Sequence, residues 1–300
     1  MKNSANSTII RLTIVALLLA GLSGCASQQI RTQMPVVPEK VAINTKFLKL
    51  GLRGPYGGYE IEGCSIITGI ETQEKTRKAP SGGLLGAIAE HKQLSGAAKM
   101  IVEENESVMK YDLLSEVDSI VRAEVKNLHT HTILDASLTP AGNNVMELKP
   151  WVYLSACADG NTGRITGRVG VYLRAFLKDK GGSEIWRGGY NYQSSTVRPF
   201  EGSEGWFADN GRHLKSTIRD GYRTVVRVMM KDSLGAKAGW GSEEVKLRIN
   251  LPGGQKPYTM DAVILKRTEK EIFYTPKTGK AWFNYGVNVV PKEDIEIVTE

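Results

Sequence analysis

A change of hydrophobic period in the middle of the chain constrains the fold most strongly. From Met109 to Leu128 the apolar residues recur at helical spacing, with charged residues on the opposite side. Beyond Leu128 the period falls to two, which places successive side chains on opposite faces of a strand. The stretch ITGRVGVYLRAFLKD, residues 165–179, is the most regular case, because its odd-numbered residues from 165 to 177 are all apolar. An amphipathic helix packed on a half-buried sheet is therefore expected.

Four alternating segments follow that helix and predict an antiparallel meander. They cover residues 128–138, 146–157, 165–178 and 183–194, and short turns such as DKGG join them. A second amphipathic helix is expected over GRHLKSTIRDGYRTVVRVMMKD, residues 211–232, with Asp209 or Asn210 as its N-cap.

The C-terminal part has a different pattern. Strand-like stretches near 245–251, 260–267, 270–275, 281–286 and 293–298 are separated by turns such as PGG and PKTG. Five short strands in about 60 residues fit a small barrel. The expected fold class is α+β: a four- to five-stranded antiparallel meander packed by two helices, followed by a small all-β SH3-like barrel or roll. We expect an α/β binding domain over 45–237 and a small β-domain over 238–300.

The N-terminus has the pattern of an export signal. Lys2 and Arg11 precede or interrupt a short apolar stretch that ends at Leu22, and no acidic residue occurs before Glu39. The following Leu-Ser-Gly-Cys resembles the lipobox of bacterial lipoproteins. That resemblance implies cleavage after residue 24 and diacylglyceryl attachment to Cys25. An ordinary secretory signal with a cysteine near its cleavage site is the alternative.

The resemblance also implies a location. Ala26 and Ser27 after the cysteine favour the outer membrane of a Gram-negative bacterium, with the chain facing the periplasm. Residues 25–44 are rich in Gln and Pro and are expected to form a lipidated tether. Without its signal the chain carries a modest positive charge, which suits work beside anionic lipid or glycan. No nucleic acid is expected as a partner in that compartment.

If Cys25 is acylated, two cysteines remain. Cys64 and Cys157 form an even pair in an oxidising compartment, where disulfides persist. We expect a bridge between them, with two free thiols as the alternative.

The element order also resembles known periplasmic α/β modules. Helix, four-stranded meander and helix over residues 45–235, together with the lipobox and the stretch SEIWRGGYNYQS, are similar to three groups of envelope proteins. These are the curli-secretion lipoprotein, the N-terminal domain of the Tol-system propeller protein and the auxiliary lipoproteins of lipid-transporting ABC systems. The resemblance implies binding and assembly, and no catalytic residue carries over from it.

Two features are candidate binding surfaces. The second expected helix carries five basic residues at consecutive steps of four, which form a slanted ridge. These residues, called the basic ridge, are Lys215, Arg219, Arg223, Arg227 and Lys231. The ridge fits lipid phosphates, anionic glycan or an acidic protein. The alternative is a solvated helix face, balanced by acidic residues from the C-terminal β-domain.

The loop RPFEGSEGWFADNG precedes that helix. It places Phe200, Trp206 and Phe207 among glycines, a composition in which aromatic side chains are often exposed for contact with protein or glycan. Packing of the three rings onto the sheet is the alternative.

The sequence gives little support for a catalytic or metal-binding site. His129, His131 and Asp135 would share one face of a strand and could bind zinc, but a merely solvated polar face explains them as well. The stretch EGSEG lacks the first glycine of GxSxG, and HExxH is absent. We therefore expect no enzyme, no metal and no cofactor, with an unrecognised hydrolase as a remote alternative.

Taken together, the sequence predicts an outer-membrane lipoprotein that acts as a binding or assembly component of a cell-envelope complex for secretion, transport or surface-structure assembly. It would be held by the acyl anchor at Cys25 and would bind an envelope protein, and oligomerisation is left open. The alternative is a lipid- or glycan-contacting accessory of a transport system.

Overall fold

The structure of the chain is a computed structural model. It describes residues 40–46, 58–61, 64–68, 105, 108, 112–127, 134–135, 137–158, 165–200, 202–233, 240–250, 257–277 and 286–298. Cys25 and the expected export signal lie outside these residues. Among the described helices, none is long and apolar enough to cross a membrane.

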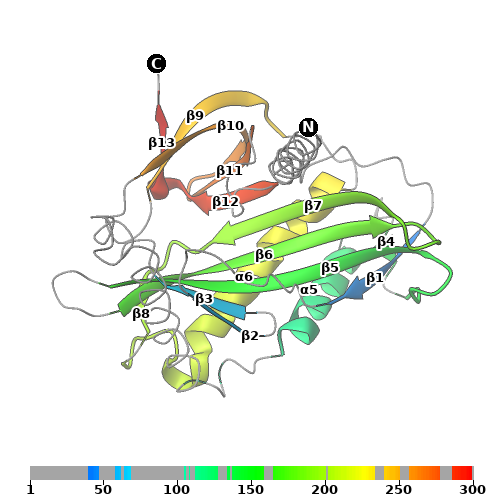
Figure 1. Cartoon of the computed structure of the whole chain (residues 1–300), viewed down its shortest axis with the longest axis horizontal. Helices are drawn as coiled ribbons and strands as arrows, with labels where there is room; N and C mark the ends of the chain where they lie inside the picture. The colour runs from blue at the N-terminus through cyan, green and yellow to red at the C-terminus, as the bar shows by residue number, and fades with distance from the viewer. Residues whose placement is uncertain are drawn as a thin grey trace, which may run out of the picture.

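The described strands join into one mixed sheet of thirteen strands, shown in Figure 1. Along its main path the order is β13-β9-β10-β11-β12-β7-β6-β5-β1-β4. The central strands are β5 (Asn144–Ala158), β6 (Ile165–Lys178) and β7 (Glu184–Gln193). They pair antiparallel in sequence order, as the alternation predicted. The α+β class and the antiparallel meander are thus confirmed, in a larger sheet than expected.

Two helices pack on the sheet. They are α5 (Leu113–Asn127) and α6 (Ala208–Ser233), and Figure 1 shows α6 crossing β6 and β7 with α5 beside it. The alternating apolar residues of β5 and β6 face the helices. Their side chains are fully buried at Met146, Leu148, Leu154, Val171 and Leu173. Burial of such side chains contributes about 1.5–3 kcal/mol each, so this helix–sheet interface is the main source of stability.

Local signals explain where each helix begins and how closely it packs. Asp112 caps α5, because its carboxylate accepts hydrogen bonds from the backbone N–H and the hydroxyl of Ser115, at 3.1 and 2.7 Å. These bonds lower the pKa of Asp112. Gly221 lets α6 approach the sheet, since a Cβ there would lie 2.8 Å from the Tyr192 ring and 2.9 Å from Val171.

The N-terminal edge of the sheet differs from the expectation. Val41–Thr45 forms β1, which pairs parallel to the first part of β5 and has its first three residues buried. The prediction of a tether over 25–44 is therefore wrong at its end, because the short apolar run VAI enters the core. β3 (Cys64–Thr68) pairs parallel to the later part of β5 and antiparallel to β2 (Gly58–Ile61).

The expected strand over 128–138 is described only as β4 (Leu134–Asp135). It pairs with β1 in parallel, and not with β5 as a meander would require. Residues 128–133 lie outside the described part of the chain. The first helix is also shorter than predicted at its N-terminal end, because the cap at Asp112 sets its start.

The C-terminal strands have a core of their own but are continuous with the main sheet. They are β9 (Glu243–Ile249), β10 (Tyr258–Arg267), β11 (Glu271–Pro276), β12 (Val287–Pro291) and β13 (Ile295–Val298), with a 3-10 turn η1 (Lys292–Asp294). β12 pairs parallel to β7, so these strands extend the sheet beyond β7 (Figure 1). A separate barrel is therefore not seen among the described strands. The domain boundary near residue 238 stays a prediction.

Buried polar contacts tie the C-terminal strands to the central sheet. Arg168 on β6 pairs with Asp294, and their side chains are only 9% and 11% exposed. Nearby, the Tyr153 hydroxyl donates to Asn191 at 3.1 Å, and the Asn191 amide donates to Asn288 at 3.2 Å. Burial raises the pKa of the Tyr153 hydroxyl, which keeps it protonated as a donor. Polar partners with such specific geometry define one docked position of these strands.

Candidate functional site

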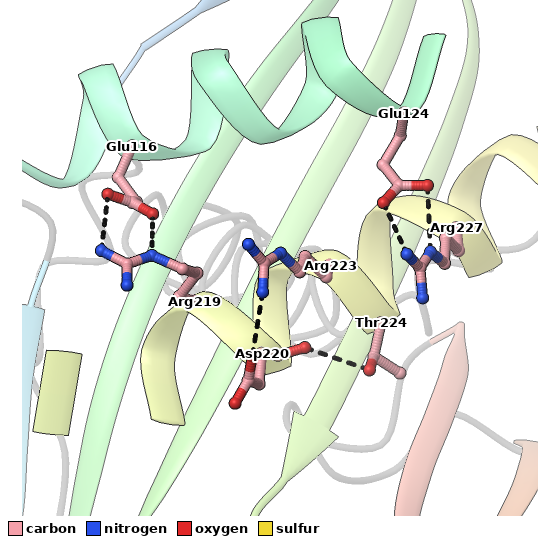
Figure 2. A network of polar contacts seen from close by, with 7 residues as sticks. All are labelled: Glu116, Glu124, Arg219, Asp220, Arg223, Thr224 and Arg227. Carbon is pink, nitrogen blue, oxygen red and sulfur yellow. Dashed lines mark hydrogen bonds and ion pairs between the residues drawn. The ribbon is translucent and has the colours of Figure 1, made fainter. Parts of the chain in front are cut away.

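The two helices are joined by a pair of ion bridges, which we call the α5–α6 clamps. Figure 2 shows Arg219 facing Glu116 and Arg227 facing Glu124. Arg227 is bidentate, since its Nε and Nη2 donate to the two Glu124 oxygens at 2.9 and 2.8 Å. Hydrogen bonding to Glu124 raises the pKa of Arg227. The two glutamates lie eight residues apart, as the two arginines do, so the bridges are repeated two turns apart along the helices.

The basic ridge is therefore not a row of free charges. Besides the two clamps, Arg223 pairs with Asp220 of its own helix at 3.3 Å (Figure 2). Lys215 is half-buried, and Lys231 lies over the Trp240 ring at 4.4 Å. The prediction of a continuous cationic surface is wrong for its three arginines, because α5 and Asp220 supply their counter-charges. The sequence alternative named acidic residues of the C-terminal β-domain, whereas the main ones come from α5.

We expect the Glu124–Arg227 clamp to contribute about 1 kcal/mol to the free energy of unfolding. Arg227 is 63% exposed, so solvent screens the pair, but its bidentate geometry adds strength. A double-mutant cycle with Glu124→Gln and Arg227→Gln, read by urea denaturation, measures the coupling. The Asp220–Arg223 pair, with side chains 63% and 49% exposed, is the control and should couple by about 0–0.3 kcal/mol. Equal coupling in both cycles would refute the clamp.

The aromatic loop lies inside the fold. Phe200 and Trp206 are 2% and 0% exposed and Phe207 is 9% exposed, so the prediction of an exposed aromatic surface is wrong. The Trp206 indole N–H donates to the Gly167 carbonyl at 2.8 Å, and the rings of Phe200 and Phe207 pack at 5.8 Å. Gly167 on β6 makes room for Phe200, because a Cβ there would lie 2.7 Å from its ring. Gly167 was the one sequence feature that could have indicated this packing, because a glycine within a strand leaves room for a ring.

The turn into α6 also differs from the prediction of an ordinary N-cap. Asp209, Asn210 and Gly211 have φ of 50°, 54° and 70°, so the chain makes three consecutive left-handed residues before the right-handed helix continues. Asp209 pairs with Arg212 at 2.8 Å. Gly211 is required here, since a Cβ would lie 2.2 Å from Val108.

A cavity of about 280 Å³ lies between α6 and the strands β10 and β11. We call it the α6–β11 pocket. Helix α6 contributes two members of the basic ridge, Arg227 and Lys231, and the strands contribute Lys266, Glu271 and Phe273. The remaining lining residues are Thr224, Val228, Trp240 and Thr268. This site could not be predicted from the sequence, because Trp240, Lys266 and Phe273 come from three separate segments with no common motif.

The pocket has an excess of positive charge. The Arg227 guanidinium is neutralised by Glu124, whereas Lys231 and Lys266 have no carboxylate within ion-pair distance among the described residues. Each ammonium lies over a ring instead: Lys231 over Trp240 at 4.4 Å and Lys266 over Phe273 at 5.6 Å. Burial raises the pKa of Glu271, the one acidic residue in the lining, and Lys266 and Lys270 act in the opposite direction. The Trp240 indole N–H is buried without a hydrogen-bond partner.

The predicted disulfide does not agree with strand register. Cys64 lies opposite Val152 on β5, and Cys157 lies five residues further along the same strand. At about 3.3 Å per residue this offset is roughly 16 Å, far beyond the ~7 Å Cα separation that a bridge allows. The Cys64–Cys157 bridge therefore stays a prediction, which this backbone register does not favour.

The zinc alternative rests on residues that are mostly undescribed. His129 and His131 lie outside the described residues, and Asp135 is engaged by Ser137 and by Lys40 at 3.1 Å. These contacts lower the pKa of Asp135 to about 2. Within the described ranges, no group of three or more His, Cys, Asp or Glu side chains could hold a metal ion.

Comparison with protein families and with curated proteins gives no relative. No protein-family model matches the chain, and no curated protein matches it in sequence. A function is therefore inferred from the residues of this chain alone.

Proposed function

We propose that this chain is a lipid-anchored protein of the bacterial outer membrane that faces the periplasm and acts as a binding or assembly component of a cell-envelope complex. The observation that carries the proposal is the sequence LSGC after a basic and apolar N-terminus, which makes Cys25 the anchor. Acyl chains on that cysteine would give stable membrane attachment, because each buried methylene contributes about 0.8 kcal/mol.

The arrangement of the folded part supports a binding role. Helix α5, the meander β5–β7 and helix α6 follow each other in the order on which the resemblance to periplasmic envelope modules rests. The C-terminal strands add a second unit that is held to the central sheet by buried polar contacts. We also propose that the strands of residues 238–300 curl into a small barrel-like roll.

A second function is favoured by one observation. The α6–β11 pocket carries two ammonium groups that lack carboxylate partners among the described residues, which suits an accessory protein that contacts anionic lipid or glycan. In that role the pocket, and not the whole basic ridge, would be the contact point.

Metabolic labelling with an alkyne analogue of palmitate tests the anchor. The full chain should be labelled and should sediment with outer membranes, whereas Cys25→Ser should lose the label and leave the membrane fraction. Cys64→Ser is the matched control and should keep both properties. Label that persists in Cys25→Ser, or a wild-type chain found only among free periplasmic proteins, would contradict the proposal. Cross-linking of the anchored chain followed by purification in detergent then tests for an envelope protein partner.

A further inference from the structure

We infer that the α6–β11 pocket is a binding site for a phosphoryl group, carried either on a small soluble ester or on a lipid headgroup. This inference goes beyond the proposed function and does not depend on the anchor at Cys25. It rests on the cavity, on the charges that line it and on a buried donor that has no partner.

The charges that line the α6–β11 pocket favour an anion. Within the part of the chain that the structure describes, most basic side chains near α6 face a carboxylate, as Arg219, Arg223 and Arg227 do. Lys231 and Lys266 are exceptions, and both line the same cavity. Two like charges in one cavity repel each other, so an anion between them is stabilising. Glu271 offsets only one of the two charges and is itself disfavoured as an anion by burial.

The hydrogen-bond donors of the pocket favour a phosphoryl group. A buried indole N–H without a partner is costly, by about 1–3 kcal/mol, and the Trp240 N–H is in that state in a side chain that lines the cavity. With the two ammonium groups of Lys231 and Lys266, the pocket has three donor groups. A phosphoryl group offers three acceptor oxygens, which match these donors better than the two oxygens of a carboxylate do.

The volume of the pocket and its aromatic wall fit a small phosphoryl compound. A volume of about 280 Å³ accepts a phosphoryl group with a short carbon chain. The rings of Trp240 and Phe273 hold the lysine ammonium groups at 4.4 and 5.6 Å, and these rings also offer an apolar wall for that chain. The site is therefore built from α6 on one side and from the C-terminal strands on the other.

Titration calorimetry on the full chain in detergent tests the inference with glycerol 3-phosphate as the soluble probe. We expect saturable binding that weakens with salt and that falls at least tenfold in the double variant Lys231→Gln, Lys266→Gln. Lys292→Gln removes an exposed ammonium of the same C-terminal region outside the pocket and should bind as the wild type does. Acetate at equal concentration should bind at least tenfold more weakly.

Flotation with vesicles distinguishes the lipid source. In this arm the Cys25→Ser chain is used, so that the anchor cannot carry the protein to the membrane. Binding to phosphatidylglycerol vesicles, with none to phosphatidylcholine vesicles and a loss in the double variant, would assign the site to a headgroup. Binding of glycerol 3-phosphate alone would assign it to a soluble ester.

Trp240→Phe gives a test that does not depend on the lysines. The ring remains for Lys231 to contact, but the N–H is removed, so phosphoryl binding should weaken about three- to tenfold. The thermal midpoint should not fall, because the N–H has no hydrogen bond to lose. Absence of binding to both probes, or binding that neither the double variant nor Trp240→Phe weakens, would overturn the inference, as would equal binding of acetate.

Discussion

Replacing Asp294 by alanine is expected to lower the free energy of unfolding by about 3–5 kcal/mol. The substitution removes the carboxylate that faces Arg168, whose side chain is only 9% exposed. A buried guanidinium without its counter-charge loses both hydration and pairing, and this uncompensated charge is the main cost. Urea denaturation of the wild type and the variant measures the loss.

An exposed pair in the same region is the control. Glu296 on β13 faces Arg248 on β9 at 3.5 Å, with side chains 56% and 48% exposed. Glu296→Ala should cost less than about 1 kcal/mol, because solvent already screens the pair. The double variant Arg168→Met, Asp294→Leu should recover most of the stability lost in Asp294→Ala, since no charge is then buried. Equal losses for Asp294→Ala and Glu296→Ala would contradict a buried bridge.

Trp206→Ala is expected to destabilise the fold by about 3–5 kcal/mol. The side chain is fully buried, and its indole N–H satisfies the Gly167 carbonyl. Alanine leaves a cavity beside β6 and an unpaired carbonyl. Thermal or urea unfolding distinguishes this result from the role predicted from sequence, in which an exposed tryptophan would affect binding and leave stability nearly unchanged.

Two further variants refine the test of Trp206. Trp206→Phe keeps most of the ring and removes the hydrogen bond, so a loss of about 1–3 kcal/mol is expected. Val197 precedes the same loop and is 46% exposed, and Val197→Ala should change stability by less than about 0.5 kcal/mol. A loss for Trp206→Ala no greater than that for Val197→Ala would show that the loop is not packed as described.

The central elements could be predicted because their signal is local. Alternation along β6 and the helical stripe of α6 each depend on residues that are neighbours in sequence, and the structure buries the residues that these patterns selected, such as Val171 and Tyr222. In contrast, β1 has only five residues and gains its place by parallel pairing with β5, about a hundred positions away. No local period reports a pairing of that kind.

The candidate site could be predicted only in part, for a related reason. The spacing of four along α6 showed that its basic residues form a ridge, but the counter-charges Glu116 and Glu124 lie 103 residues earlier. That tertiary pairing determines which basic residue of the ridge remains without a carboxylate partner among the described residues. The pocket likewise combines one face of α6 with Lys266 and Phe273, whose placement follows from the joining of β12 to β7.

The parallel pairing of β12 with β7 also has a consequence for how the chain reaches its native state. Residues 287–289 must find partners at 190–192, so β7 gains its second neighbour only after about a hundred further residues of the chain are available. Until then the edge of β7 stays open, and Arg168 lacks the carboxylate of Asp294, which lies 126 residues later. Loop closure over such a separation slows folding. The joining of β12 to β7 is therefore expected to be a late step of folding, and a molecule that has not made it keeps an open sheet edge along β7.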